Sequence, residues 1–217
     1  MEIVFVSGWA TSKGIWGESG DFELPVHYLD WNTVLSGRYK LPESCILAGW
    51  SLGGQLAMEL SSRQEVKGLV LVSSMSCMAW SKNRPGIAPS THREIVSMLK
   101  RSREGYLRSF FRECGADRDK LPDLVKNSSA FSTRDLLHGL DVMFSKVAVP
   151  APDIPATVIH GTADRIIPFS SAEYIKQELF GGKASFLPVT EGGHLIPLTH
   201  PEIITQEVKK LAERIDS

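Results

Sequence analysis

The stretch Cys45–Leu60, CILAGWSLGGQLAMEL, indicates how this chain folds. It begins with an apolar run that predicts a buried strand and ends with an apolar run that favours a helix. At the junction, Ser51 has glycines two positions before and two positions after it, at Gly49 and Gly53. A plain turn needs one glycine, so this spacing predicts a sharp strand-to-helix turn at which only glycine leaves room for neighbouring segments. The serine hydroxyl is then exposed beside a helix N-terminus, whose amides favour negative charge.

The alternation of strand and helix continues on either side of this turn. Strands are predicted where short apolar or β-branched runs occur, at residues 3–6, 22–31, 45–50, 66–74, 156–161 and 184–189. Pro25 weakens the second of these strands. Helices are predicted over residues 52–63, 170–178 and 201–215. Strands that alternate with helices predict an α/β fold with a mostly parallel sheet and helices on both of its faces.

Residues 76–151 interrupt this alternation with polar, basic and mostly helical sequence that contains no convincing strand. From residue 76 to residue 150 there are 13 Lys and Arg against 8 Asp and Glu, although the whole chain is close to neutral. We interpret the segment as a helical lid inserted into the core. The chain then divides into a first core part over residues 1–75, the lid, and a second core part over residues 152–217.

The overall composition indicates one globular domain with an inserted lobe. The chain has 217 residues, of which 42% are hydrophobic, and a net charge of −1. This length supports a sizeable core, and the balanced charge predicts no general attraction to nucleic acid. The three cysteines are widely spaced and the first residues do not resemble a signal peptide, so we expect a cytoplasmic protein. No run approaches the roughly 18 apolar residues of a membrane span, and we expect a monomer.

Ser51 in this setting predicts nucleophilic catalysis, with a glycine-rich turn that has no chemistry as the alternative. A serine hydroxyl is a weak nucleophile at neutral pH, so it needs a base, and the base needs an acid to orient it. After a nucleophile of this kind, the acid and then the base follow along the chain. Asp164 comes just after the strand 156–161, and His194 follows the last strand. Both are predicted at the carboxyl edge of the sheet, where open α/β folds bind ligands.

Other acidic and imidazole side chains are weaker candidates for these two roles. His160 ends a strand four residues before Asp164, and histidines at such positions more often pack or brace a loop. The remaining histidines lie in the doubtful strand, in the lid or at the start of the last helix, at His27, His92, His138 and His200. Asp141 and Asp153 lie in the lid and in the linker after it, so Asp164 is better placed.

Acyl transfer also needs hydrogen-bond donors for the tetrahedral oxyanion. The amide of Leu52, directly after the serine, is predicted to be one donor. The loop after the first strand should supply the other, and the amide of Trp9 is our candidate. The Trp9 indole either packs in the core or lines the pocket, and its backbone amide can donate in both cases.

Metal and nucleotide chemistry have little support in this sequence. It contains no HExxH motif, no cysteine–histidine cluster and no paired acidic motif of the kinds that bind metals. It also lacks the GxGxxG and Walker loops that bind nucleotides. We therefore expect no metal and no cofactor.

Besides the serine motif, several longer stretches of this sequence are characteristic: SGWA, LAGWSLGG, LVLVSSMSCMAWSKNRPGIAP, GTADRIIP and GGHLIPLTHP. At these stretches, which span most of the chain, it resembles the α/β-hydrolase superfamily. More narrowly, it resembles the pimeloyl-acyl carrier protein methyl ester esterases of biotin synthesis. The resemblance implies Ser51 as nucleophile, Asp164 as orienting acid and His194 as base. It also implies substrate contacts from the core and from the lid, by Trp9, Leu52, His194, Phe110, Phe111 and Cys114.

Three features depart from the usual pattern of that family. The first loop usually opens with His-Gly, and here it opens with Ser7-Gly8, which removes an imidazole but keeps the backbone amide. The leading hairpin of the sheet is expected to be missing. The segment between Trp31 and Ser44 is short and should hold a helix of one or two turns. These differences leave the catalytic edge of the sheet unchanged.

The lid also carries a run of basic residues between Arg84 and Arg112, where seven Lys and Arg are opposed by two Glu. One interpretation is a solvated helical face. The other is a docking site for an acidic protein such as acyl carrier protein, because local positive potential steers such a partner. The candidate docking residues are Arg93, Arg101, Arg108 and Arg112.

These patterns together predict a serine carboxylesterase, and the resemblance implies that its substrate is the methyl ester of an acyl chain, on pimeloyl-acyl carrier protein. A generalist esterase, thioesterase or C–C hydrolase is the first alternative, because pocket shape rather than the triad decides specificity. A non-catalytic binding protein on the same scaffold is the second. The complete and correctly ordered triad argues against it.

Overall fold

The computed structural model describes residues 1–17 and 22–216. Its sheet contains β1 (Glu2–Val6), β2 (Val26–Leu29), β3 (Cys45–Trp50), β4 (Val66–Val72), β5 (Ala156–Gly161) and β6 (Ser185–Val189). The strand order is β2-β1-β3-β4-β5-β6, and every pairing within the sheet is parallel. The predicted parallel sheet is therefore confirmed. The doubtful second strand exists but begins only after Pro25, because proline restricts a strand to an edge position or to its start.

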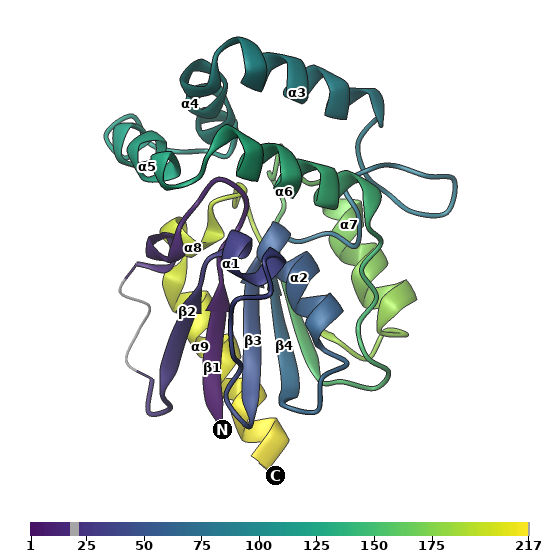
Figure 1. Ribbon diagram of the computed structural model, residues 1–217. Coiled ribbons are helices and arrows are strands. Elements are labelled where there is room, and N and C mark those ends of the chain that lie inside the picture. The colour runs from purple at the N-terminus through teal and green to yellow at the C-terminus, as the bar shows by residue number, and fades with distance from the viewer. Residues whose placement is uncertain (18–21, 217) are drawn as a thin grey trace.

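Helices cover both faces of the sheet, as predicted (Figure 1). One face carries α2 (Leu52–Leu60) and α7 (Phe169–Tyr174), which continues as a π-helical turn over Ile175–Leu179. The other face carries α9 (Pro201–Asp216). Alternate strand residues point to opposite sides, so Leu47 belongs to the same buried cluster as Ala172 of α7, whereas Ile46 belongs to the same cluster as Leu211 of α9. Short helices fill the connections: the 3-10 helix η1 (Lys13–Trp16), α1 (Trp31–Leu35) and α8 (Ile196–Thr199).

The lid is helical and lies over the carboxyl ends of the strands, opposite the N- and C-termini (Figure 1). It contains α3 (Ser90–Arg101), α4 (Arg103–Glu113), α5 (Leu121–Asn127), the 3-10 helix η2 (Ser128–Ala130) and α6 (Thr133–Ser145). Helix α6 contacts α1 and α2 of the core on one side and α3 on the other. It therefore lies between the core helices and α3 of the lid. Within the described ranges, no helix is long and apolar enough to cross a membrane.

The two ends of the lid meet at the core. Two hydrogen bonds join Ser76 and Ala148. The Ala148 amide donates to the Ser76 carbonyl at 2.8 Å, and the Ser76 hydroxyl donates to the Ala148 carbonyl at 2.8 Å. The buried Gln55 amide on α2 donates to the carbonyls of Ser76, at 3.2 Å, and Lys146, at 2.9 Å. Both lid ends are thus tied to the helix that follows Ser51. These bonds support our proposal that the lid spans residues 76–151.

Candidate active site

Ser51 sits on a strained turn between β3 and α2. Its backbone angles are φ 55° and ψ −121°, a conformation that L-residues rarely adopt. A Cβ on Gly53 would lie 2.2 Å from the Val6 carbonyl oxygen, and a Cβ on Gly49 would lie 2.3 Å from the Gly53 carbonyl oxygen. Real Cβ atoms do not approach backbone oxygens so closely, so the crowding expected around the serine is confirmed. The turn fixes where the Ser51 hydroxyl points.

The side chains of Ser51, His194 and Asp164 form one hydrogen-bonded chain. His194 Nε2 lies 3.1 Å from Ser51 Oγ, and His194 Nδ1 lies 2.8 Å from Asp164 Oδ2. Asp164 follows β5 and His194 follows β6, so the sheet edge brings together residues that are far apart in sequence. The indole of Trp50 donates to the His194 carbonyl at 2.8 Å and so fixes the loop that carries the imidazole.

The surroundings of Asp164 determine the proton positions in this chain. Burial raises the pKa of the Asp164 carboxyl, but the adjacent imidazoles and the Ile167 amide outweigh burial and hold the pKa below its ordinary value. Asp164 is therefore an ionised carboxylate that only accepts hydrogen bonds. His194 Nδ1 must then carry the hydrogen, which leaves Nε2 free to accept the hydroxyl proton of Ser51. This arrangement can activate a serine nucleophile.

The two amides predicted to bind the oxyanion are those of Leu52, which directly follows Ser51 on the first turn of α2, and Trp9, in the loop after β1. Among the described residues, neither amide has a hydrogen-bond acceptor. The Ser7 hydroxyl donates to the Thr11 carbonyl at 2.9 Å and accepts from the Trp31 amide at 3.2 Å. Ser7 thus braces this loop at the position where the family usually has histidine. The free amides are available to an anion.

The Trp9 side chain joins the same loop to the lid. Its indole is 2% exposed, and its Nε1–H donates to the Leu136 carbonyl of α6 at 2.8 Å. The ring packs edge-on against Phe110 of α4, with centroids 5.1 Å apart and an interplanar angle of 90°. Trp9 is therefore a core aromatic that connects the loop to a lid residue.

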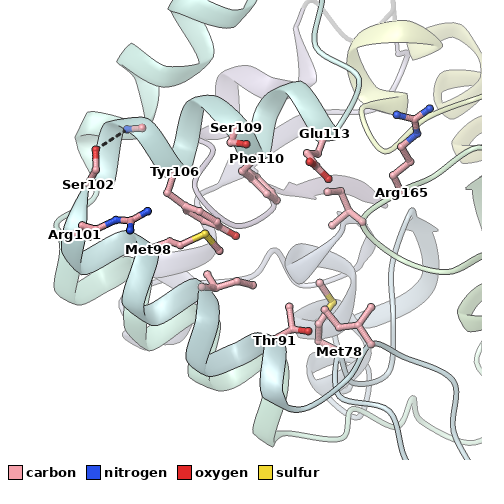
Figure 2. Close-up of a pocket in the computed structure, with 14 residues that line it drawn as sticks. Met78, Thr91, Met98, Arg101, Ser102, Tyr106, Ser109, Phe110, Glu113 and Arg165 are labelled. Atoms are coloured by element: carbon pink, nitrogen blue, oxygen red, sulfur yellow. Dashed lines mark hydrogen bonds between the residues drawn. The ribbon is translucent and has the colours of Figure 1, made fainter.

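A cavity of about 640 Å³ lies between α3 and α4 of the lid, and Figure 2 shows side chains of both helices turned into it. Its lining is mainly apolar, with Met78, Ile87, Ile95, Met98, Tyr106, Phe110 and Ile166. Arg101 lies at one end, and Arg165, which directly follows Asp164, lies at the other (Figure 2). Neither Ser51 nor His194 lines this cavity. The lining includes Arg165 of the acid loop and Phe110, whose ring packs against Trp9 of the loop after β1.

The profile of the alpha/beta hydrolase family matches residues 16–207. The chain belongs to this family. A relative from Wigglesworthia glossinidia brevipalpis, named pimeloyl-acyl carrier protein methyl ester esterase, is 24% identical over 248 residues, which cover 100% of this chain and 95% of the relative. A relative of the same name from Pectobacterium carotovorum is 25% identical over 194 residues, 84% of this chain and 74% of its own.

Solved structures agree with this assignment of the fold. The esterase EaEST from Exiguobacterium antarcticum superposes with a TM-score of 0.80 at 18% identity, covering 100% of this chain and 92% of that one. A bromoperoxidase from Bacillus anthracis superposes with a TM-score of 0.77 at 17% identity, covering 98% and 92%. At such identities the likeness shows the α/β-hydrolase fold.

Of the side chains predicted to contact substrate from the lid, only Phe110 lines the cavity of this hydrolase. Phe111 is 0% exposed and belongs to the core, because successive helix residues point about 100° apart. We therefore correct its predicted contact with an acyl chain to a packing role. Cys114 is also buried and absent from the lining, and burial raises the pKa of its thiol. Leu52 is fully buried, so its side chain is not exposed to a substrate and only its backbone amide remains a candidate contact.

The structure adds cavity residues that were not predicted. On α3, Thr91, Ile95 and Met98 follow helical spacing along one face, and on α4, Tyr106 and Glu113 lie on the same face as the predicted Phe110. This spacing is visible in the sequence, but it does not show that the two faces oppose each other. The sequence did not indicate Arg165 because its place in the cavity lining depends on the folded lid lying beside the acid loop.

The four candidate docking arginines are all exposed on the outer lid helices, Arg93 and Arg101 on α3 and Arg108 and Arg112 on α4. Arg101 also lines the cavity, and Arg108 pairs with Glu104 at 3.2 Å. Another basic residue of this run, Arg103, turns inward and donates to the carbonyls of Ser128 and Phe131. Arg103 is therefore structural, whereas the four candidate docking side chains are exposed on the lid surface.

Proposed function

We propose that this α/β hydrolase is a serine carboxylesterase. The observation that carries the proposal is the hydrogen-bonded chain from Ser51 through His194 to Asp164, with distances of 3.1 Å and 2.8 Å. An ionised, buried carboxylate at one end and a serine on a strained turn at the other are the arrangement that nucleophilic ester cleavage requires. The proposal does not depend on any cofactor.

The proposed mechanism uses the groups in their observed positions. Ser51 Oγ attacks the ester carbonyl while His194 Nε2 takes its proton, and Asp164 stabilises the imidazolium that forms. The free amides of Trp9 and Leu52 donate to the oxyanion of the tetrahedral intermediate. His194 then gives its proton to the departing alcohol. Water, deprotonated by the same imidazole, attacks the acyl-enzyme, and the imidazolium returns this proton to Ser51 Oγ as the acid leaves.

We propose that the lid cavity takes the acyl chain of the ester. Its mainly apolar lining and its volume of about 640 Å³ suit an extended hydrocarbon chain. Its lining includes Arg165, the residue after Asp164, and Phe110, which packs against Trp9. The names of the two relatives lead us to propose a methyl ester of pimeloyl-acyl carrier protein as the substrate, and a role in biotin synthesis.

The exposed arginines of the outer lid helices support an acidic carrier as partner. Arg93, Arg101, Arg108 and Arg112 lie on the same two helices that enclose the cavity. An acidic carrier protein that docks on these helices would bring its attached acyl chain to the cavity. Attraction between exposed charges is screened by salt, so carrier-dependent turnover should weaken as ionic strength rises.

Replacing the nucleophile tests the chemistry first. Ser51→Ala should reduce hydrolysis of a p-nitrophenyl ester by about 10⁶-fold, and it should abolish labelling by a fluorophosphonate probe. Ser129→Ala, which removes an exposed lid hydroxyl, is the matched control and should keep wild-type rates. Full activity of Ser51→Ala would refute the assignment.

The carrier is tested separately, with arginines that do not line the cavity. Arg108→Glu combined with Arg112→Glu should raise KM for the carrier-bound methyl ester and leave KM for the free monomethyl ester unchanged. Lys67→Glu, an exposed change on β4, is the control for charge reversal alone. Equal effects on both substrates, or none, would leave a serine esterase without carrier docking.

A further inference from the structure

His160 is a buried imidazole that the proposed mechanism does not use. It lies near the end of β5, four residues before Asp164, and is 0% exposed. Its Nε2 lies 3.1 Å from the carbonyl oxygen of Ile167 and 3.5 Å from Asp164 Oδ2. One ring nitrogen therefore faces both the acid and the end of the turn that carries the acid.

The Asp164 carboxylate is surrounded on both of its oxygens. Oδ1 accepts from the amides of Ile166, at 2.8 Å, and Ile167, at 3.0 Å. Oδ2 accepts from His194 at 2.8 Å and faces His160 at 3.5 Å. Nitrogens of two imidazoles thus lie within 3.5 Å of one carboxylate oxygen.

The geometry also fixes the tautomer of His160. Nε2 faces two acceptors, a carbonyl and a carboxylate, so it must carry the hydrogen. Nδ1 is buried and has no hydrogen-bond partner among the described residues. A proton on Nδ1 would be an unpaired donor in the protein interior, which is costly. Phe169 of α7 packs edge-on against the ring, with centroids 5.9 Å apart, and opposes a flip.

His160 and His194 are therefore suited to different charge states. Burial lowers the pKa of His160, and the opposing effect of Asp164 only partly offsets burial. His160 stays neutral while His194 gains and loses its proton during turnover. A second positive charge beside Asp164 would compete with the imidazolium of His194 for the same carboxylate. A neutral donor orients the acid without this competition.

We propose that His160 is a positioning residue of the triad, a neutral Nε2–H imidazole that holds the Asp164 carboxylate and the turn 164–167 in register with His194. The inference rests on the proposed role of Ser51, His194 and Asp164. It assigns no contact between His160 and the substrate. Its effect is on how well Asp164 orients the base.

Two substitutions separate positioning from packing. His160→Leu keeps apolar volume but removes the donor, whereas His160→Gln keeps an N–H near the position of Nε2. With a p-nitrophenyl ester, His160→Leu should lower kcat by about 10- to 100-fold, as expected for a misplaced catalytic group, with KM unchanged. His160→Gln should recover most of kcat. Wild-type kcat in His160→Leu, or equal losses in both variants, would overturn the proposal.

A second measurement does not depend on activity. Nitrogen-15 NMR of the wild-type protein, with the His160 signals assigned by their loss in His160→Gln, should show a neutral Nε2–H ring throughout the pH range of activity. A charged ring or an Nδ1–H tautomer would overturn the proposal. If Ser51→Ala were active, the proposed function would fail. If Ser51→Ala is inactive and His160→Leu has wild-type kcat, only this inference fails.

Discussion

The carboxyl edge of the sheet and the lid cavity differ in what holds their residues in place. At the sheet edge, backbone contacts fix Ser51, because any side chain on Gly49 or Gly53 would overlap a neighbouring carbonyl. In the lid, side chains of α3 and α4 face each other across open space of about 640 Å³. The first region tolerates almost no change in position, whereas the second can change shape by exchanging side chains.

This difference matches the division of labour in the proposed reaction. Proton transfer needs hydrogen-bond distances such as the 2.8 Å between His194 and Asp164. Binding of an acyl chain needs only apolar surface and sufficient volume. We therefore expect substitutions at the sheet edge to change kcat or stability, and substitutions of the cavity lining to change KM.

The largest effect is expected at the acid. Asp164→Asn should lower kcat by about 10⁴-fold, because an amide can donate to His194 and favours the wrong tautomer. KM and the thermal midpoint should change little. The measurement is steady-state kinetics on a p-nitrophenyl ester, with Asp153→Asn, an exposed site in the linker, as the control. A loss below tenfold would contradict the assignment of Asp164.

The next largest effect is expected at the two adjacent phenylalanines of α4. One packs in the core and the other lines the cavity, so their substitutions compare the two roles directly. Phe111 is fully buried, so Phe111→Ala should lower the free energy of unfolding by about 3–5 kcal/mol. Phe110 lines the cavity, so Phe110→Ala should cost less stability and raise KM for a long-chain ester more than for an acetate ester. Urea unfolding and chain-length kinetics measure the two effects. The reverse order of stabilities would contradict the placement of these rings.

Glycine substitutions test the crowding at the nucleophile turn. Gly53→Ala should destabilise the protein by about 1–3 kcal/mol, the usual range for overpacking, and should also lower kcat. Gly14→Ala is the matched control, because its Cβ would meet its nearest atom at 3.6 Å. Thermal unfolding of both variants distinguishes them. If both changes were equally mild, the turn would be less constrained than the close contacts indicate.

The smallest effect is a pH dependence of stability. The pKa of His160 in the folded protein lies below its ordinary 6.5, so below pH 6.5 the unfolded chain binds a proton that the folded chain does not. The free energy of unfolding of the wild type should therefore fall as pH decreases through this window. His160→Gln lacks this term, so its deficit relative to the wild type should shrink by up to about 1.4 kcal/mol per pH unit.

Urea unfolding at several pH values measures this deficit. His138→Gln, a change at an exposed lid histidine, is the control. A deficit of His160→Gln that stays constant with pH would contradict a neutral buried His160. The contribution of Asp164 appears separately, because its pKa is lowered from 3.8 and its stabilisation is lost only at more acid pH.

The sequence predicted the core of this protein better than its lid, for a physical reason. Strands, the serine turn and the loops after β5 and β6 depend on local patterns: apolar runs, paired glycines and the position of a residue after a strand. Those patterns placed Ser51, Asp164 and His194 at one edge, where the structure joins them by hydrogen bonds. Even there, a local pattern did not resolve the limits of β2, which starts only after Pro25.

Positions in the lid depend on how separate helices pack. The choice between Phe110 and Phe111 as the lining residue is decided by the direction from which α3 approaches α4, which no local pattern records. The role of Arg165 likewise depends on where the lid rests relative to the acid loop. The position of His160 at a strand end predicts packing or bracing of a loop, but its distance to Asp164 becomes visible only in the fold.

The double hydrogen bond between Ser76 and Ala148 has a consequence for how such enzymes diversify. The insertion leaves and re-enters the core at one point, so its length hardly affects the positions of the strands on either side. Closing a longer loop between fixed ends costs little additional entropy. A different helical insertion grafted between these two residues would therefore bring a new substrate preference to an unchanged catalytic apparatus. Because the Gln55 side chain binds both ends of the insertion, one helical insertion can replace another while the core stays in place.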